Sequence, residues 1–379
     1  MSEENNHSFV SFYEKHKVSP VSQNLGSLQE QFERRARLFK ALAITPSYIS
    51  KSKIIEFGPG SGHNTIILSL INTNTVDIVD KNSTGIEELK GLYKKYNAKE
   101  PKIHFEFFEQ FKSNEEYDLC WAEGCIPQQQ KPIRVLKHVA SVVRPGGSLV
   151  CTSINGISYM SEILRRVVSS MLMTDDFENN VKVLTKFFKT HCHSLKGMTR
   201  PVEDWVIDSL INPLQFGRLL SIPDIIQTLK EYDVISTLPN FYTNWDWYKT
   251  QNQQTNSERL SEAYFSYNYN LIDSAIHSPL LHDKSAGKKL EDEANRLWET
   301  MCSQQINGLD VDVYSEIFSD LTKTLEKFDS FFAEKVSYVF EMILRSDLDE
   351  LSNCEFFANW WGRGQQYCHL QKNLLSINK

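Results

Sequence analysis

The chain has 379 residues, of which 41% are hydrophobic and 23% are charged, and its formal net charge is −7. This composition is ordinary for a globular protein with a sizeable core. Its Lys and Arg residues are scattered. Together with the negative net charge, this disfavours nucleic acid as a partner, because such binding depends on neutralising phosphates.

The sequence also indicates a compartment. The first residues, MSEENNHSFV, are polar and charged and do not resemble a signal peptide. No apolar run of about 18 residues predicts a membrane-spanning helix. The seven cysteines form no CxxC pair, so we expect buried thiols in a reducing compartment. A cytoplasmic protein is therefore expected.

A first helix is predicted over residues 27–43, after an irregular lead-in. Apolar residues recur there every three or four positions, and Arg35 falls on the same face. Thr45-Pro46 predicts the end of this helix, because proline disfavours helix in the residue before it. Residues 1–49 are treated as one N-terminal segment.

Strands and helices then alternate along the chain. Alternation with short connections predicts a mostly parallel sheet covered by helices on both faces. The expected strands are 53–57, 75–80, 102–108, 117–122 and 148–153, and the expected helices are 65–71, 86–96 and 133–143.

The alternation breaks after Asn155-Gly156. Residues 159–172 show a strongly apolar helical face, and a helical, loop-rich stretch follows. Residues 156–221 are therefore predicted as a helical insertion within a sheet domain that covers residues 50–250.

The sheet domain is expected to resume after the insertion. A helix is predicted over 222–229 and a strand over 232–238, and residues 240–248 are expected to form the last strand. No proline follows Pro279, and apolar residues recur at near-helical spacing towards the end. Residues 251–379 are predicted as a helical C-terminal region.

The most informative stretch is IIEFGPGSGH, at residues 54–63. A strand runs into a loop with three alternating glycines, which opens a helix. Glycine permits the sharp turn and lets a ligand approach without a Cβ in the way, and the helix N-terminus offers free N–H groups. The spacing differs from the dinucleotide fingerprint GxGxxG, because His63 stands where the third glycine would fall. A dehydrogenase is therefore disfavoured.

A second feature supports a nucleoside site. Asp80 ends the second expected strand, 18 residues past Gly62, where an acid can accept hydrogen bonds from both ribose hydroxyls. The turn Arg144-Pro145-Gly146-Gly147 precedes the fifth expected strand.

In this order and spacing, these features resemble the class I S-adenosylmethionine-dependent methyltransferases. The resemblance covers residues 50–155 well and 222–250 loosely. It implies a Rossmann-like α/β fold with a mostly parallel seven-stranded sheet and helices on both faces, plus the helical insertion and the helical C-terminal region. It also implies S-adenosylmethionine as the cofactor and S-adenosylhomocysteine as the product.

The resemblance assigns cofactor-binding residues. Glu56–Gly62 matches the family's first motif and Asp80 its ribose-binding acid. Glu109 stands where the family often has an acid or amide near the adenine amino group. YDLCWAEG, residues 117–124, resembles the fourth-strand motif that faces the methionine end. The residues expected to bind the cofactor are Glu56, Gly58, Pro59, Gly60, Gly62, Asp80, Lys81, Glu109, Gln110 and Glu123.

The catalytic candidates are Glu123, His191 and His193, with His63 as a further candidate base. Glu123 is expected to contact the cofactor's amino group, act as a base, or cap the next turn. In a strand, His191 and His193 would share one face, within an insertion expected to cover the substrate. No further cluster of ligands completes a metal site around them, so no metal is expected. Arg35 is expected to pair with the cofactor carboxylate or with an acid of the protein.

A hydroxyl acceptor needs a base during methyl transfer, so the candidate bases favour oxygen methylation of a small-molecule or saccharide acceptor. An N- or protein-methyltransferase, and an inactive binding protein with this fold, are the alternatives. The N-terminal segment is expected to cover the cofactor or substrate, and the C-terminal helices to form a substrate lid or a homodimer interface. The lead-in loosely resembles bacterial enzymes associated with surface-polysaccharide or natural-product gene clusters.

Overall fold

The structure is a computed structural model that describes residues 8–16, 27–127, 129–198, 200–213, 218–245, 247, 249 and 255–374. The chain divides into two compact units. The first unit comprises Met1–Ser153, Leu220–Ser261 and Gln365–Lys379, and the second comprises Ile154–Leu219 and Glu262–Gly364. Each unit therefore combines segments that are far apart in the sequence.

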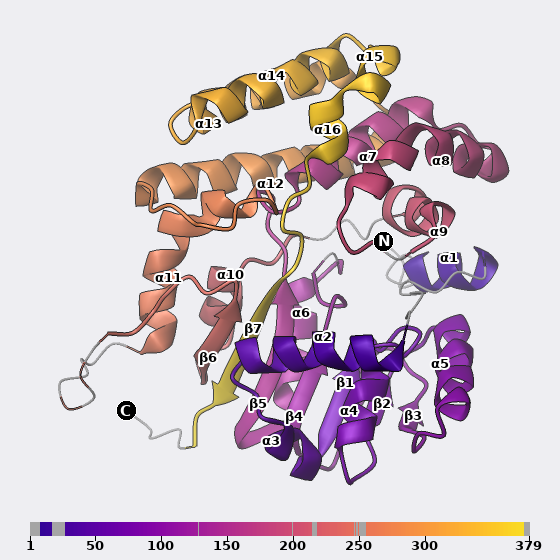
Figure 1. The fold of residues 1–379 in the computed structure, drawn as a ribbon, viewed down its shortest axis with the longest axis vertical. Coiled ribbons are helices and arrows are strands. Elements are labelled where there is room, and N and C mark those ends of the chain that lie inside the picture. Colours follow the sequence, from indigo (N-terminus) through magenta and orange to yellow (C-terminus); the bar gives the residue numbers. More distant parts are fainter. Residues whose placement is uncertain are drawn as a thin grey trace. The chain divides into compact units, whose positions relative to one another are not determined.

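The described residues of the first unit form a seven-stranded sheet with the order β3-β2-β1-β4-β5-β7-β6 (Figure 1). Neighbours from β3 to β5 are parallel, whereas β7 runs antiparallel to both β5 and β6. This arrangement confirms the expected mostly parallel seven-stranded sheet. The strands are β1 (Ile54–Phe57), β2 (Asp77–Val79), β3 (Lys102–His104), β4 (Tyr117–Ala122), β5 (Val143–Ser153), β6 (Tyr232–Leu238) and β7 (Gln366–Lys372).

Helices cover both faces of this sheet. Figure 1 shows α2 crossing in front of the strands and α6 behind them. The helices of the first unit are α1 (Ser8–His16), α2 (Leu28–Ala41), α3 (Pro46–Lys51), α4 (Thr65–Ile71), α5 (Ser83–Lys95), the short 3-10 helix η2 (Phe108–Gln110), α6 (Pro132–Ser141) and α10 (Ile222–Thr228). Helix α11 (Asn256–Tyr267) begins in the first unit and ends in the second.

Helix α2 is held by a cap at its start and by its apolar face. The Ser27 hydroxyl accepts a hydrogen bond from the backbone N–H of Glu30 at 3.1 Å, which satisfies one of the free donors of the first turn. Phe39 of α2 packs edge-on against Trp121 of β4, with 5.7 Å between the ring centroids. Both belong to the core cluster that joins α2, α4 and α5 to β1, β2 and β4.

The last strand to enter the sheet is not where the sequence pattern placed it. Residues 240–245 form no strand, and β7 instead comes from Gln366–Lys372, within a tail expected to be entirely helical. The segment QYCHLQK lacks a clear apolar alternation, because its polar residues are buried against specific partners. The Gln366 side chain accepts a hydrogen bond from the Ser153 hydroxyl at 3.2 Å, and His369 lies 3.0 Å from the Ser148 hydroxyl.

The described residues of the second unit are helical. Its helices are α7 (Met160–Leu172), α8 (Phe177–Ser194), α9 (Val202–Val206), η3 (Ile207–Ile211), η5 (Asn268–Leu271), α12 (Lys284–Asn307), η6 (Val311–Tyr314), α13 (Ser315–Leu325), α14 (Ser330–Leu344), α15 (Leu348–Asn353) and α16 (Glu355–Asn359). The insertion packs with the tail, since α7 contacts α12. A Cβ on Gly156 would lie 2.4 Å from the backbone carbon of Ala294. Glycine is therefore needed where the insertion meets α12.

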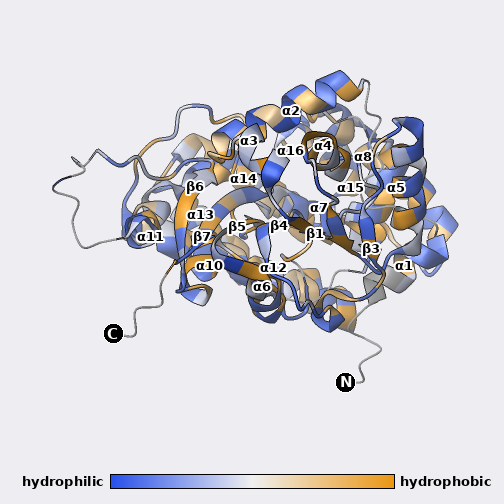
Figure 2. Cartoon of the chain, turned by 90° about the horizontal axis from the view of Figure 1, so that it is seen from below, coloured by the Kyte–Doolittle hydropathy of each residue, from blue (hydrophilic) through white to orange (hydrophobic). Residues whose placement is uncertain are grey.

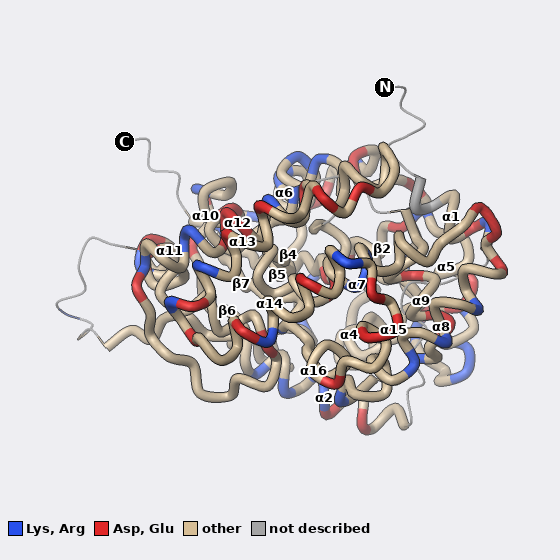
Figure 3. Tube along the Cα trace, turned by 90° about the horizontal axis from the view of Figure 1, so that it is seen from above, with Lys and Arg blue, Asp and Glu red and all other residues tan. Residues whose placement is uncertain are grey.

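Hydropathy and charge follow the usual division between core and surface. Figure 2 shows hydrophobic residues concentrated on the strands, with hydrophilic residues on outer helix faces such as that of α5. Figure 3 shows Lys and Arg interspersed with Asp and Glu along the trace. Across the described residues, no helix combines the length and hydropathy required to cross a membrane. All seven cysteines are free thiols, and five of them are buried.

Candidate active site

The glycine loop leaves the carboxyl end of β1 and leads into α4. Gly58, Gly60 and Gly62 all have positive φ, at 70°, 55° and 78°. A Cβ would lie 2.7 Å from the Cys125 Cβ at position 58, and 2.6 Å from the Leu89 Cγ at position 62. Both the backbone conformation and the available space therefore require glycine at these two positions.

Asp80 connects this loop to the end of β2. Its Oδ1 accepts a hydrogen bond from the backbone N–H of Asn82 at 2.8 Å, and the carboxylate also accepts hydrogen bonds from the backbone of Gly60 and Lys81. Burial raises the pKa of Asp80 to about 6, against the effect of these hydrogen bonds. A carboxylate offers about four acceptor positions, so Asp80 retains the capacity to accept a further hydrogen bond beside the loop.

Glu56 lies on β1 immediately before the loop and is only 2% exposed. Burial, reinforced by the negative charge of Glu123, raises the pKa of Glu56 to about 8. Its Oε2 is buried and has no hydrogen-bond partner among the described residues. Unpaired buried oxygens are rare in folded proteins, so this atom is a candidate ligand contact.

Glu123 follows β4 and is the best-connected of the expected site residues. Its Oε1 accepts hydrogen bonds from Tyr367 at 2.6 Å and from Asn64 at 3.2 Å. Its Oε2 accepts from the Trp121 Nε1 at 2.9 Å and from the Arg35 Nη1 at 2.8 Å. The ion pair with Arg35 is the internal pairing considered for that residue from the sequence.

These contacts decide the ionisation of Glu123. Burial alone would raise its pKa, but the Arg35 charge and the hydrogen bonds from Tyr367 and Trp121 hold the pKa below the usual value for a glutamate. The carboxylate is therefore ionised at neutral pH and its oxygens are already engaged. A lowered pKa makes Glu123 a weak base, and its oxygens already accept hydrogen bonds, so Glu123 is disfavoured as a proton acceptor.

The other expected cofactor residues lie around the same sheet edge. Lys81 follows Asp80, and its Nζ lies 4.2 Å from the centroid of the Phe105 ring. Glu109 is partly buried and Gln110 is exposed, and both belong to η2. The neighbouring Phe108 packs edge-on against Phe57, at 5.6 Å between centroids.

The histidine candidates occupy different units and environments. His63 lies in the glycine loop, where its Nδ1 is 2.6 Å from the Ser61 hydroxyl. Burial, aided by the charge of Lys95, lowers the pKa of His63. It is therefore neutral at pH 7 and able to accept a proton.

His191 and His193 belong to the second unit and lie on helix α8 rather than on a strand. His191 is fully buried, and its Nδ1 accepts a hydrogen bond from the Arg165 Nε at 3.1 Å. Burial, with the nearby Arg165 charge, lowers the pKa of His191 to about 2. His193 is exposed. Residues two apart point in different directions on a helix, so the face that His191 and His193 would share in a strand does not form.

Sequence reasoning missed several residues that complete this site. Tyr367 approaches Glu123 from β7, and Asn64 follows the glycine loop. Gln31 of α2 donates to the Asn64 Oδ1 at 2.8 Å and to the backbone oxygen of His63 at 3.2 Å. The helical spacing of Gln31 and Arg35 was a usable signal, since both lie on the buried face of α2. No pattern in the sequence around Tyr367 indicated that it belongs to this site.

The sheet order, the single antiparallel strand and the loop–acid pair at adjacent strand ends define the Rossmann-like fold of class I S-adenosylmethionine-dependent methyltransferases. Residues 28–234 match the family described as a methyltransferase domain. The chain belongs to this methyltransferase-domain family. No match was found among curated proteins.

Solved structures similar to the chain include three at low identity. TehB from Haemophilus influenzae is 18% identical, with 33% of this chain and 46% of that chain covered and a TM-score of 0.26. A S-adenosylmethionine-dependent methyltransferase from Clostridium acetobutylicum ATCC 824 is 15% identical, with 35% and 61% covered and a TM-score of 0.27. Coclaurine N-methyltransferase, bound to N-methylheliamine and SAH, is 10% identical, with 94% and 77% covered and a TM-score of 0.38. The chain spans less than two thirds of the first two.

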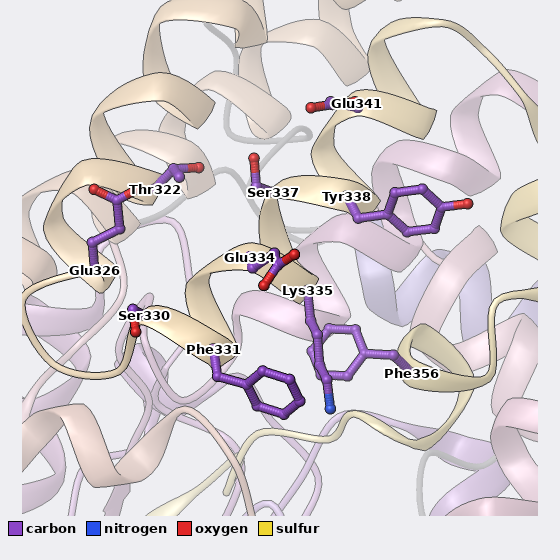
Figure 4. Close-up of a pocket in the computed structure, with 10 residues that line it drawn as sticks. All are labelled: Thr322, Glu326, Ser330, Phe331, Glu334, Lys335, Ser337, Tyr338, Glu341 and Phe356. Carbon is purple, nitrogen blue, oxygen red and sulfur yellow. The ribbon is translucent and has the colours of Figure 1, made fainter.

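The second unit contains an open cavity of about 770 Å³ between α13 and α14, with Phe356 at its rim (Figure 4). None of the expected site residues lines it. The Lys335 Nζ lies 4.1 Å from the centroid of the Phe331 ring and 5.6 Å from that of Phe356. Its aromatic surface is therefore already in contact with a cation of the protein itself. Elsewhere in the described residues, no three His, Cys, Asp or Glu side chains gather as a metal site.

Proposed function

We propose that the protein transfers the methyl group of S-adenosylmethionine to an oxygen atom of a small-molecule or glycan acceptor, leaving S-adenosylhomocysteine. The observation that carries this proposal is the connection between the glycine loop and Asp80, which places three glycines beside a buried carboxylate with a spare acceptor position. A nucleoside with ribose hydroxyls fits this combination.

The residues of the first unit fit the cofactor chemically. Asp80 supplies a carboxylate acceptor for the ribose, and the loop from Gly58 to Gly62 supplies backbone donors and acceptors, with no side chain at its three glycines. Glu109 and Gln110 of η2 supply polar groups for the adenine end. The bound sulfonium supplies an already activated methyl group. The protein's own residues therefore mainly orient the acceptor and remove water, which can contribute several powers of ten in rate.

The acceptor proton needs a destination if the acceptor atom is a hydroxyl oxygen. Glu123 has a lowered pKa and accepts hydrogen bonds at both oxygens, and His191 is buried against Arg165. His63 remains the best-supported base in the first unit, because it is neutral at pH 7 and lies in the glycine loop. We propose His63 as the group that takes the proton.

The engagement of Glu123 also favours a second candidate function. A neutral amine needs little help in losing its proton, so an N-methyltransferase would not require a strong base at this position. His63→Gln separates the two candidates. For oxygen transfer, the variant should lose roughly 10²–10⁴-fold in rate and lose the acidic limb of its pH profile. For nitrogen transfer, the variant should keep the wild-type rate and the acidic limb of the wild-type pH profile.

We propose further that the N-terminal segment and the helical second unit contribute the acceptor site, with a homodimer interface as the alternative role of the C-terminal helices. A photoreactive acceptor should label residues within 154–219 or 262–364, as read by peptide mass spectrometry. If light scattering instead finds a dimer and no labelling occurs in those ranges, the acceptor-site role is wrong.

The central experiment measures binding and transfer in turn. Isothermal titration calorimetry should show binding of S-adenosylmethionine and S-adenosylhomocysteine but not of NAD. A screen of hydroxyl- and amine-bearing acceptors with a radiolabelled methyl donor then identifies the acceptor atom. NAD binding without S-adenosylmethionine binding would overturn the proposal. Binding of S-adenosylmethionine without transfer to any acceptor would support an inactive binding protein instead.

A further inference from the structure

The cavity between α13 and α14 is an exposed groove with a rigid base. Phe318 of α13 stacks on Phe340 of α14, with 4.0 Å between the ring centroids, and both rings are buried. On the exposed side, the two helices line the cavity of about 770 Å³. Phe331 and Tyr338 of α14 contribute two rings that are 64% and 47% exposed. They are seven positions apart and therefore share one helix face. Exposed apolar surface of this kind, with polar residues around it, is typical of an interaction site.

The polar side chains around these rings are mainly acidic. Glu326, Glu334 and Glu341 line the groove, against one basic residue, Lys335, among the described lining residues. Arg345 lies 3.4 Å from Glu341, but both side chains are exposed, and such pairs contribute little in water. The groove therefore has a surplus of negative charge.

This surplus extends over the neighbouring helices. Ser315–Asn359, from the start of α13 to the end of α16, contains ten acidic and four basic residues. The segment thus has a net charge of −6, against −7 for the whole chain. A surface with so concentrated a charge attracts partners of the opposite charge and disfavours acidic ones.

The position of Lys335 shows how a cation is accommodated in the groove. Figure 4 shows its side chain beside the rings of Phe331 and Phe356, and its Nζ lies 4.1 and 5.6 Å from their centroids. Both distances allow a cation–π interaction. An incoming Lys or Arg side chain would compete with Lys335 for the Phe331 ring and would find the three glutamates nearby.

The exposure of the lining residues indicates which kind of cationic partner fits. Six of the ten lining side chains are exposed and the other four are half-buried. A small-molecule site usually encloses most of its ligand, whereas this groove is open to solvent. A helix that lies in a groove with its apolar face inwards is a recurrent mode of polypeptide recognition. Such a helix can place apolar anchors on the rings and basic side chains beside the glutamates.

We propose that the groove between α13 and α14 binds a basic amphipathic helix of a partner protein. This goes beyond the proposed methyl transfer, because the groove shares no residue with the proposed cofactor site or with the proposed base. Titration with S-adenosylmethionine tests the proposed function, and titration with a peptide tests the groove. Failure of one leaves the other standing.

The test uses a fluorescent peptide as long as α14, 15 residues, with Lys and Leu placed so that they form an amphipathic helix. A matched peptide has Glu in place of each Lys. Fluorescence anisotropy measures the binding of both peptides to the full-length protein. The Lys peptide should bind with an affinity that falls as the salt concentration rises, because salt screens exposed charges, and the Glu peptide should not bind. A Lys peptide that fails to bind would contradict the proposal.

Two matched triple variants distinguish the groove from the net charge of the protein. Glu326→Gln/Glu334→Gln/Glu341→Gln should bind the Lys peptide roughly 3- to 100-fold more weakly, the combined effect of three exposed ion pairs. The control neutralises three exposed glutamates outside the groove and reaches the same net charge: Glu87→Gln/Glu178→Gln/Glu203→Gln. It should bind the peptide like the wild type. Equal weakening in both triple variants would show that only net charge matters, and the groove would be rejected.

The aromatic rings predict effects in opposite directions. Phe331→Ala removes an anchor and should weaken binding of the Lys peptide roughly fivefold or more. Lys335→Met removes the internal competitor and should strengthen binding roughly 2- to 5-fold, the range of an exposed cation–π contact. Neither side chain is buried, and thermal denaturation verifies that both variants remain folded. Weaker binding by Lys335→Met would contradict a cation site at these rings.

Two other occupants of the groove are distinguishable outcomes. If spermine binds as tightly as the Lys peptide and responds to the same substitutions, the groove takes a small polyamine. If light scattering finds a wild-type dimer that Phe331→Glu dissociates, a second copy of the chain covers the groove. Either result would overturn the proposal of a partner helix.

Discussion

The Tyr367 hydroxyl donates a 2.6 Å hydrogen bond to the Glu123 Oε1 although 244 positions separate the two residues. Tyr367 lies on β7 and Glu123 follows β4, so the contact spans the intervening β5 within the sheet. The negative charge of Glu123 raises the pKa of Tyr367 further above a value already raised by burial. Tyr367 is therefore a fixed donor throughout the usable pH range.

Removal of this donor should cost stability. Tyr367→Phe keeps the ring but leaves Glu123 with one acceptor position unfilled, and we expect a loss of about 1.5–3 kcal/mol in the free energy of unfolding. Urea denaturation measures it. Tyr338→Phe is the matched control, because Tyr338 is 47% exposed, and it should change stability little. An unchanged free energy of unfolding in Tyr367→Phe would mean that the Tyr367 hydrogen bond contributes nothing to stability.

The proposed role of Asp80 predicts a selective loss of cofactor affinity. Asp80→Ala should weaken S-adenosylhomocysteine binding by about 1.5–3 kcal/mol, the scale of hydrogen bonds to a charged acceptor. The exposed Glu87 of α5 serves as the control, and Glu87→Ala should bind as tightly as the wild type. Calorimetry on folded protein is the measurement, with circular dichroism to verify folding. Unchanged affinity would remove Asp80 from the site.

The geometry at Gly62 predicts that one added carbon lowers the stability of the protein. Gly62→Ala places a Cβ 2.6 Å from the Leu89 Cγ at a φ of 78°, and we expect a loss of about 1–3 kcal/mol in stability. A Cβ added at Gly91 on α5 would meet nothing within 4 Å. Gly91→Ala should therefore be neutral or stabilise the protein by up to about 1 kcal/mol. Thermal denaturation compares the two, and a neutral Gly62→Ala would contradict the packing of the loop.

Glu56 predicts a pH dependence of stability in the cofactor-free protein. Because burial, with Glu123, raises the pKa of Glu56 to about 8, the fold stabilises the protonated form. That contribution is fully present below the pKa of an ordinary glutamate and is lost as pH rises through about 8, at about 1.4 kcal/mol for each unit of the shift. Glu56→Gln remains neutral and should melt at a higher temperature than the wild type above about pH 8, but at a similar temperature near pH 4. If the melting temperatures of the two proteins differed by the same amount at every pH, the raised pKa of Glu56 would be contradicted.

The environment of His191 predicts a structural rather than catalytic role. His191→Leu leaves the buried Arg165 Nε without its acceptor, and we expect a loss of about 1–3 kcal/mol in stability. The pH profile of methyl transfer should not change, since a group with a pKa of about 2 does not titrate in the working range. A shifted profile in the folded variant would restore His191 as a candidate base.

Patterns of consecutive residues predicted the glycine loop and the acid at the end of β2. The glycine spacing and the acid at the end of β2 were readable because each feature is imposed by a few consecutive residues. The shared face considered for His191 and His193 depended on a strand, although the segment lies within the insertion predicted as helical. The longer spacing of Leu184, Phe188, His191 and Cys192, all buried on α8, is helical. A window of three residues is too short to distinguish the two periods.

The strand β7 could not be predicted for a different reason. Its central position would ordinarily produce an apolar run, yet Gln366 and His369 are buried there through hydrogen bonds to Ser153, to Ser148 and to the backbone oxygen of Leu42. Such partners are set by tertiary structure and leave no pattern in the segment itself. The contact of Tyr367 with Glu123 is hidden for the same reason.

The position of β7 also determines when the sheet can be completed during translation. β7 lies between β5 and β6 in the sheet. Both β5 and β6 leave the ribosome before β7, so the edges that pair with β7 stay unpaired until residues 366–372 have been translated. Residues 262–364 of the second unit are translated between β6 and β7. A nascent chain therefore cannot assemble Glu123 with its Tyr367 donor, and cannot bind cofactor with full affinity, until translation has passed β7. Ribosome-bound chains stalled before residue 366 should expose strand edges that recruit chaperones.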